Sequence, residues 1–142
     1  MPVEKLSVSL TPDIMAQINT RAEGNVSGAI NKSLARYFAL LQRGLAELRS
    51  QLSEQECSLI LDATNGSAFS DTISLNMLWA DIEDAVTLDG LDQKWGVDGP
   101  ALVAKIKLAG MAGQTALIDA SERWWNRVSA EENPGYAELL TA

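Results

Sequence analysis

The stretch Lys5-Leu6-Ser7-Val8-Ser9-Leu10 determines how the rest of the chain is interpreted. It alternates polar and apolar residues with a period of two, and the β-branched Val8 favours an extended backbone. In a strand, the three apolar side chains point to one face, and Lys5, Ser7 and Ser9 point to the other. The stretch therefore predicts a β-strand with one face for a core and one face for solvent.

The chain offers this strand no partner, because the rest of the sequence has helical patterns. A lone strand leaves a row of unpaired backbone N–H and C=O groups. The same strand from a second copy, paired antiparallel about a two-fold axis, satisfies them. Such a ribbon exposes Lys5, Ser7 and Ser9 of both copies on one face, and it fits the DNA major groove. The alternative interpretation is an ordinary edge strand whose polar side chains are solvated.

The composition excludes several classes of site. The 142 residues allow one ordinary domain or two small ones, and 46% hydrophobic residues allow a packed core. Cys57 is the one cysteine and there is no histidine, so an intrachain disulfide framework and a Cys/His zinc site are excluded. No glycine-rich phosphate loop or nucleophilic triad pattern occurs. We expect no enzyme, no catalytic residue, no metal and no cofactor.

The charge is distributed unevenly along the chain. Residues 1–51 contain six lysines and arginines against four carboxylates, whereas residues 52–142 contain five against fifteen. The net charge of −8 is therefore the sum of a slightly basic first part and a strongly acidic second part. This asymmetry suggests a DNA-facing part joined to an acidic part, although acidic surfaces also simply favour solubility.

Nothing in the sequence indicates a membrane. Residues 1–10 lack a basic segment followed by an apolar run, and no stretch approaches the roughly 18 apolar residues of a span. We expect a cytoplasmic protein with no membrane partner.

Two helices are predicted after the strand. Thr11 suits an N-cap and Pro12 the first helical position, and an apolar face recurs every four residues from Ile14. Gly24-Asn25 ends this helix. Asn25 or Ser27 caps a second helix, which continues to about residue 50, with Gly44 as the expected kink or hinge.

The order of strand, short helix, glycine-containing turn and longer helix resembles the ribbon-helix-helix DNA-binding proteins of the Arc/MetJ type, from Lys5 to about Leu41. The match is carried by the alternating strand, the Thr11-Pro12 helix start, Gly24 with Ser27, and an apolar face. That face contains Ala29, Ile30, Leu34 and Phe38.

The resemblance implies an intertwined homodimer that binds double-stranded DNA with its ribbon in the major groove. Lys5, Ser7 and Ser9 would then read bases. The start of the second helix would bind a DNA phosphate through its N–H groups, as helix N-termini bind anions in general. The phosphate-binding candidates are Asn25, Val26, Ser27, Lys32 and Arg36. Such ribbons often contain arginine or longer amides, whereas two serines predict weak discrimination per contact.

Residues 52–142 lie outside this resemblance and have all-helical patterns. Ser53 and Glu56 form a capping-box start, and Asn65-Gly66 ends that helix. Another helix opens at Asp71 or Ser74. The remaining expectations are turns at Asp89-Gly90 and Gly96–Pro100, a helix from Pro100 broken at Gly110 and Gly113, a last helix through Trp124 and Trp125, and a loosely held tail after Asn133-Pro134-Gly135.

Two features of this part could support chemistry or binding. Asp81, Glu83 and Asp84 form an acidic cluster beside Trp79, which could bind a divalent cation or could be a solvated helix face. Trp124-Trp125 cannot both face one narrow stripe, so we expect one ring to be buried. The other would be partly exposed, either at a partner surface or pocket or merely at the rim of a core. Cys57 is expected to be a small buried hydrophobe.

The sequence therefore predicts a mainly α protein with two parts. Residues 1–50 form a dimeric ribbon-helix-helix module, and residues 51–142 form a small acidic helical domain for assembly, partner or effector binding. The predicted function is sequence-specific DNA binding by a transcriptional repressor, as a dimer or higher oligomer. One alternative is an antitoxin-like protein whose second half binds a toxin. Another is a structural dimer with no role in DNA binding.

Overall fold

The structure is a computed structural model that describes residues 4–64, 82–86, 88 and 90–141. The elements in these residues are helical, and no strand occurs among them, so the mainly α class is confirmed. Residues 4–10, where the sequence predicts a strand, form no ladder with any other described segment, so that strand stays a prediction. The elements are α1 (Pro12–Ala22), α2 (Val26–Arg49), α3 (Glu54–Thr64), α5 (Leu91–Trp95), α6 (Gly99–Leu108), α7 (Gly110–Ser129) and the 3₁₀-helix η1 (Tyr136–Leu140), and residues 82–86 are also helical.

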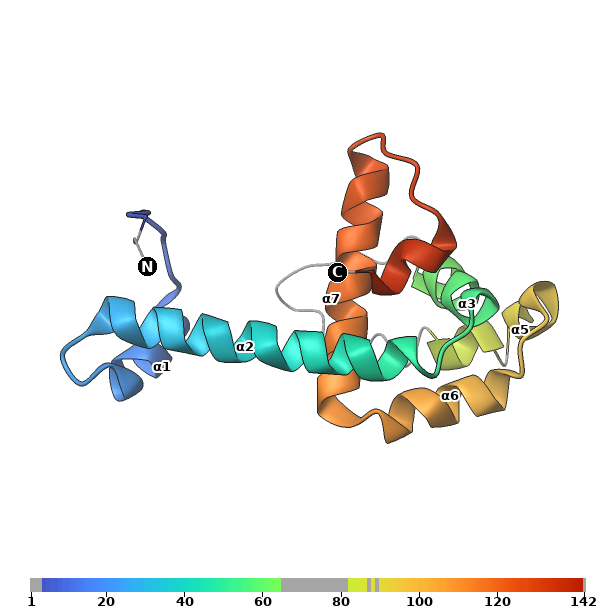
Figure 1. Ribbon diagram of the computed structural model, residues 1–142, viewed down its shortest axis with the longest axis horizontal. Coiled ribbons are helices and arrows are strands. Elements are labelled where there is room, and N and C mark those ends of the chain that lie inside the picture. Colours follow the sequence, from blue (N-terminus) through green and yellow to red (C-terminus); the bar gives the residue numbers. More distant parts are fainter. Residues whose placement is uncertain (1–3, 65–81, 87, 89, 142) are drawn as a thin grey trace. The chain divides into compact units, whose positions relative to one another are not determined.

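The chain divides into two compact units, Met1–Phe38 and Ala39–Ala142. The division falls inside α2, earlier than the boundary after residue 50 that the sequence suggested. The reason is that Leu41, Leu45 and Leu48 in the second half of α2 are buried in the core of the second unit. The first unit is therefore the N-terminal segment, α1 and the first half of α2 (Figure 1).

The helix boundaries of the first unit follow the predicted signals. The Thr11 hydroxyl accepts a hydrogen bond from the Ile14 N–H at 3.4 Å, and Pro12 opens α1. Glu23 and Gly24 both have positive φ, at 44° and 85°, so the left-handed turn begins one residue before the predicted glycine. Asn25 caps α2, since its Oδ1 accepts the Gly28 N–H at 2.9 Å.

The core of the second unit is formed by the second half of α2 together with α3, α6, α7 and η1 (Figure 1). The expected kink at Gly44 is wrong, because α2 continues as one helix through this position. A Cβ on Gly44 would overlap the Ala112 carbonyl oxygen of α7. Glycine is therefore required here for the close approach of two helices rather than for a bend.

Two further expectations are wrong, and one element was missed. Gly113 does not break a helix: α7 starts at Gly110, which has a φ of +68°, and includes Gly113. The C-terminal tail is not loose, because Leu139 and Leu140 are buried and the Leu140 carbonyl accepts a hydrogen bond from Arg49 Nε at 2.6 Å. The five-residue α5 has no apolar periodicity long enough to be predicted.

Several expectations lie outside the described residues. These are the Asn65-Gly66 helix end, the helix from Asp71 or Ser74, Trp79 and Asp81. Within the described ranges, no single helix has the length and apolarity needed to cross a membrane. The pair α6 and α7 reaches both only when taken together, across a bend of 114°.

Candidate nucleic-acid interface

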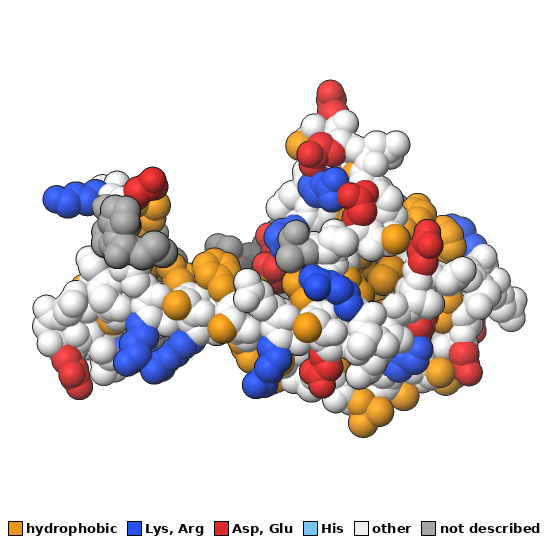
Figure 2. Space-filling model, viewed as in Figure 1, with side chains coloured by type: hydrophobic (Ala, Val, Ile, Leu, Met, Phe, Trp, Pro, Cys, Tyr) orange, Lys and Arg blue, Asp and Glu red, His pale blue; other side chains and the backbone are white. Residues whose placement is uncertain are grey.

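An apolar groove lies inside the first unit, between the N-terminal segment and the two helices. It encloses about 830 Å³. Leu6 and Val8 are 84% and 61% exposed, although both side chains are large and apolar. Figure 2 shows hydrophobic side chains at the surface of α2 in this region. The full lining is Glu4, Lys5, Leu6, Val8, Leu10, Ile14, Ile18, Ser27, Ile30, Asn31, Ser33 and Leu34.

The residues of the N-terminal segment divide between this groove and the remaining surface. Leu6, Val8 and Leu10 line the groove, whereas Ser7 and Ser9 are exposed and are not part of its lining. This matches the period of two in the sequence. Lys5 differs from the prediction in one respect, because it contributes to the rim of the groove as well as being exposed.

The N-terminus of α2 brings three predicted phosphate-binding residues together. Asn25, Val26 and Ser27 are consecutive and exposed. The Asn25 side chain is already occupied, because its Oδ1 accepts the Gly28 N–H, so Asn25 positions the turn. The backbone N–H groups of Val26 and Ser27 belong to the first turn, where a helix leaves N–H donors free for an anion.

Lys32 and Arg36 lie on a different side of α2 from the apolar groove. They follow Ile30 and Leu34 by two residues, which is about 200° around a helix. Both are therefore on the side of α2 opposite the apolar groove, where they are exposed. Among the described residues neither forms an ion pair, so their charge is available to a polyanion on that side only.

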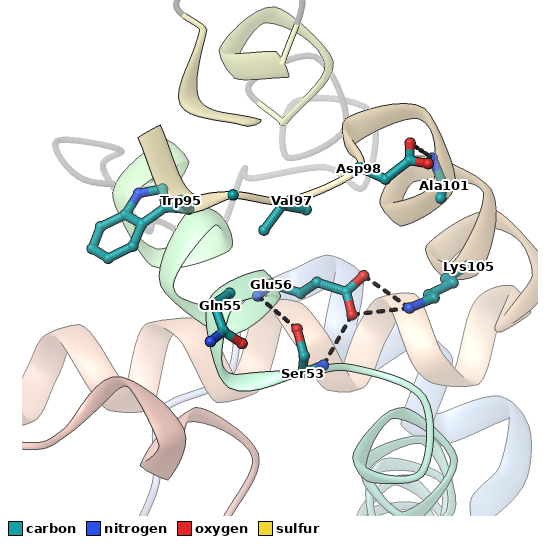
Figure 3. Close-up of a pocket in the computed structure, with 9 residues that line it drawn as sticks. Ser53, Gln55, Glu56, Trp95, Val97, Asp98, Ala101 and Lys105 are labelled. Atoms are coloured by element: carbon teal, nitrogen blue, oxygen red, sulfur yellow. Dashed lines mark hydrogen bonds and ion pairs between the residues drawn. The ribbon is translucent and has the colours of Figure 1, made fainter. Parts of the chain in front are cut away.

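The second unit contains a separate pocket of about 500 Å³, between the N-termini of α3 and α6 and the segment from Trp95 to Asp98 (Figure 3). Ser53 and Glu56 form the predicted capping box: the Ser53 N–H donates to Glu56 Oε1 at 2.9 Å, and the Glu56 N–H donates to Ser53 Oγ at 3.1 Å. Lys105 Nζ lies 2.9 and 3.0 Å from the two Glu56 carboxylate oxygens. The pocket wall is thus charge-paired rather than open to an ionic ligand.

Among the described residues of the second unit, four aromatic side chains form a continuous cluster: Trp95, Trp124, Trp125 and Tyr136. Trp124 is buried and Trp125 is half-buried, as expected for adjacent rings on one helix. The Trp124 Nε1–H donates to the Gly135 carbonyl at 3.0 Å, and the Trp125 Nε1–H donates to Thr64 Oγ1 at 3.1 Å. Tyr136 stacks on Trp124 with centroids 5.7 Å apart. The sequence indicated the tryptophan pair but not the tyrosine.

Three titratable groups of the second unit have shifted pKa values. A hydrogen bond from Lys94 lowers the pKa of Asp62, and a second one from Trp95 lowers it further. A hydrogen bond from the Gly135 N–H lowers the pKa of Glu138. Burial raises the pKa of the Cys57 thiol to about 11, and Cys57 is buried, as expected for a small hydrophobe.

The acidic cluster is only partly within the described residues. Glu83 lies 3.4 Å from Lys107 Nζ, and Asp84 is exposed, whereas Asp81 is not described. No group of three or more potential metal ligands occurs in the part of the chain that the structure describes.

Sequence reasoning missed one long-range ion pair and one local close contact. The capping-box pattern identified Glu56, but nothing local indicates that Lys105, far along the chain, completes the site. Gly28 also had no signal, although a Cβ there would lie 2.6 Å from the Asn25 amide nitrogen. Only the folded turn shows how closely the Asn25 side chain approaches this position.

Comparisons with protein-family models, with curated proteins and with solved structures found no match to this chain.

Proposed function

We propose that the protein is a sequence-specific DNA-binding regulator of transcription, a repressor that acts as a homodimer with a two-stranded ribbon in the major groove. The observation that carries the proposal is the division of the N-terminal segment. Leu6, Val8 and Leu10 line an apolar groove, and Ser7 and Ser9 remain outside it. A second copy of the segment would complete the core of the groove and would leave the polar side chains on one outer face.

The size of the first unit also favours a dimer. Met1–Phe38 has 38 residues, and units below about 40 residues usually need disulfides, metals or oligomerisation to fold. This unit contains no cysteine and no histidine, so it has neither a disulfide nor the usual zinc ligands. The proposal therefore assigns the stabilisation of this unit to oligomerisation.

The DNA contacts in this proposal have three sources. Ser7 and Ser9 would face base edges, and Lys5 would extend from the rim of the groove. The free N–H groups at the start of α2 would contact a phosphate, with Asn25 as the positioning residue. Lys32 and Arg36 lie on the opposite side of α2, so we assign them to long-range attraction of DNA rather than to the same phosphate.

The first experiment separates dimerisation from base reading. The Ser7→Ala/Ser9→Ala variant should remain dimeric in light scattering but lose sequence preference in fluorescence anisotropy with selected duplexes. The matched variant Val8→Asp places a charge in the groove and should lose both the dimer and DNA binding. Retained sequence preference in the serine double variant would contradict the proposed reading face. Binding that does not weaken with salt would contradict phosphate contacts altogether.

The antitoxin-like function is the second candidate. In antitoxins the toxin-binding tail usually folds on binding, whereas the second unit here has its own buried core and a docked C-terminal segment. This observation favours an independently folded domain for assembly, partner or effector binding. Limited proteolysis tests it: a protected fragment covering the second unit supports such a domain, and rapid digestion would support the tail.

A further inference from the structure

The last helical segment of the chain, η1, is held against α3 and α7 by contacts at both of its ends (Figure 1). Before η1, the Gly135 carbonyl accepts the Trp124 Nε1–H at 3.0 Å. At its end, Leu139 and Leu140 are buried, and the Leu140 carbonyl accepts a hydrogen bond from Arg49 Nε at 2.6 Å. These contacts form a docking site for η1 on the rest of the second unit.

The connector between α7 and this docked segment lies at the surface. Residues 129–133 are exposed, and the N–H groups of residues 130–132 donate to carbonyls in the last turn of α7. The contacts that anchor η1 come from η1 itself and the residue before it, beyond the connector. They would therefore be unchanged if η1 belonged to a second copy of the chain.

The turn in the connector is imposed by this docking rather than favoured by its sequence. Residues 130–132 are Ala-Glu-Glu, three good helix formers, yet α7 ends just before them. Glu131 has a φ of +63°, a left-handed conformation that is costly for residues other than glycine. In the described part of the second unit, the other residues with positive φ are Gly90, Gly96 and Gly110. The connector is thus strained at a kind of position where the rest of the unit has glycine.

We propose that η1 is exchanged between two copies of the chain, so that η1 of each copy occupies the docking site of the other. The chain then no longer has to reverse at Glu131, and residues 130–132 can continue α7 by nearly one turn. Pro134 limits this extension, because proline disfavours helical backbone at the residue before it. The anchoring contacts are the same in both arrangements, so relief of the short, strained connector favours exchange.

This inference rests on the homodimer of the proposed function but not on its DNA. A ribbon formed by the first units would tether two second units to each other. The tether would raise the effective concentration of each η1 at the docking site of the other copy. The exchanged segments would form a second connection between the copies and give the second unit a role in assembly.

The test uses the full chain with the substitution Tyr136→p-benzoylphenylalanine, which introduces a photoreactive side chain. The Tyr136 ring stacks on Trp124 with centroids 5.7 Å apart, so irradiation should join position 136 to α7 around Trp124. In denaturing electrophoresis, a cross-link within one copy keeps the mass of a single chain, whereas exchange gives the mass of two chains. We expect two-chain products whose cross-linked peptides map to α7 around Trp124. Val8→Asp, which should lose the dimer, should give single-chain products only.

Substitutions at Glu131 test the strained connector. Glu131→Gly removes the cost of the left-handed conformation and should lower the ratio of two-chain to single-chain products at least about tenfold. The matched control Glu131→Ala removes the same carboxylate but keeps that cost, so the ratio should not change. Light scattering should give the same dimer mass for all three proteins, because exchange within a dimer adds no copy.

The possible failures are distinguishable. A monomer in light scattering would contradict both the proposed homodimer and the exchange. A dimer that gives only single-chain products would overturn the exchange while the dimer stands. Two-chain products that map away from Trp124 would also overturn it, because they would show contact between copies without docking of η1. Two-chain products whose yield does not respond to Glu131→Gly would overturn the strained connector as the cause.

Discussion

Gly44 gives the sharpest test of the packing in the second unit. An alanine Cβ at this position would overlap the Ala112 carbonyl oxygen and would lie 2.8 Å from the Ala116 Cβ. These atoms belong to the α7 backbone and to a side chain with no rotamers, so none of them can turn away. Overpacking of this kind costs about 1–3 kcal/mol. Alanine also gains about 1 kcal/mol over glycine in a helix interior, which offsets part of the cost.

The net expectation for Gly44→Ala is a loss of up to about 2 kcal/mol in the free energy of unfolding, or up to about 8 °C in Tm. Tryptophan fluorescence during urea unfolding measures it, since all four tryptophans lie in the second half of the sequence. Ala46→Gly is the control, because Ala46 is exposed on the same helix and reports helix propensity alone. If Gly44→Ala is more stable than the parent by about the 1 kcal/mol that helix propensity alone predicts, the close contact between α2 and α7 is wrong.

Four further outcomes are expected. Glu56→Ala should lower the free energy of unfolding in urea by about 1–2 kcal/mol, because it removes the capping box and the half-exposed ion pair with Lys105. Glu56→Gln keeps the cap, so its free energy of unfolding should fall less. Equal losses in the two variants would contradict the cap. Leu139→Ala should lower the free energy of unfolding by about 2–4 kcal/mol, because Leu139 is buried. The control variant Ala137→Ser changes an exposed residue and should have little effect. A negligible effect of Leu139→Ala would mean that η1 is not packed on the core. The folded-state pKa of Cys57 is raised from 9.0 to about 11, so the contribution of this thiol to stability should be complete below pH 9 and lost as the pH rises towards 11. The thiol should also resist alkylation at about pH 8 until the protein unfolds. The pKa of Asp62 is lowered, so the contribution of this carboxylate to stability is present above pH 3.8 and lost as the pH falls below that value. Asp62→Asn should remove that part of the acid dependence of Tm. A dependence of Tm on acid pH that is unchanged in this variant would contradict the contact with Lys94.

Local signals were sufficient wherever a side chain acts on its own turn. Thr11, Asn25 and the Ser53–Glu56 pair were predicted as caps, and each forms the expected hydrogen bond. A cap depends on residues within three or four positions, so the sequence contains all the information that it needs. The same holds for Pro100, which lies in the first turn of α6, at the helix start where it was predicted.

Glycine was interpreted least reliably, because its role depends on what lies next to it. Gly44 and Gly113 both suggested breaks, yet both lie inside helices, at positions where a Cβ would meet a neighbouring element or side chain. Gly24 and Gly110 do adopt positive φ. The sequence cannot separate these two uses, since helix propensity penalises both and only tertiary packing requires the first.

The apolar stripe of α2 explains why the candidate interface could be predicted only in part. Its spacing of three and four residues is the same throughout the helix, yet Leu41, Leu45 and Leu48 are buried, whereas Leu34 and Phe38 are 47% and 55% exposed. Periodicity identifies the face of a helix that needs a core but not the molecule that supplies it. The second half of the stripe is covered by the chain itself, through α7 and its neighbours. The first half continues into the groove lined by Leu6 and Val8, which the described residues of one chain leave open. One end of α2 is thus fully packed, whereas the same face is exposed at the other end. This difference favours a second copy of the chain as the missing half of the core. In the proposed function, that second copy would pair with the extended segment and form the ribbon that reads DNA.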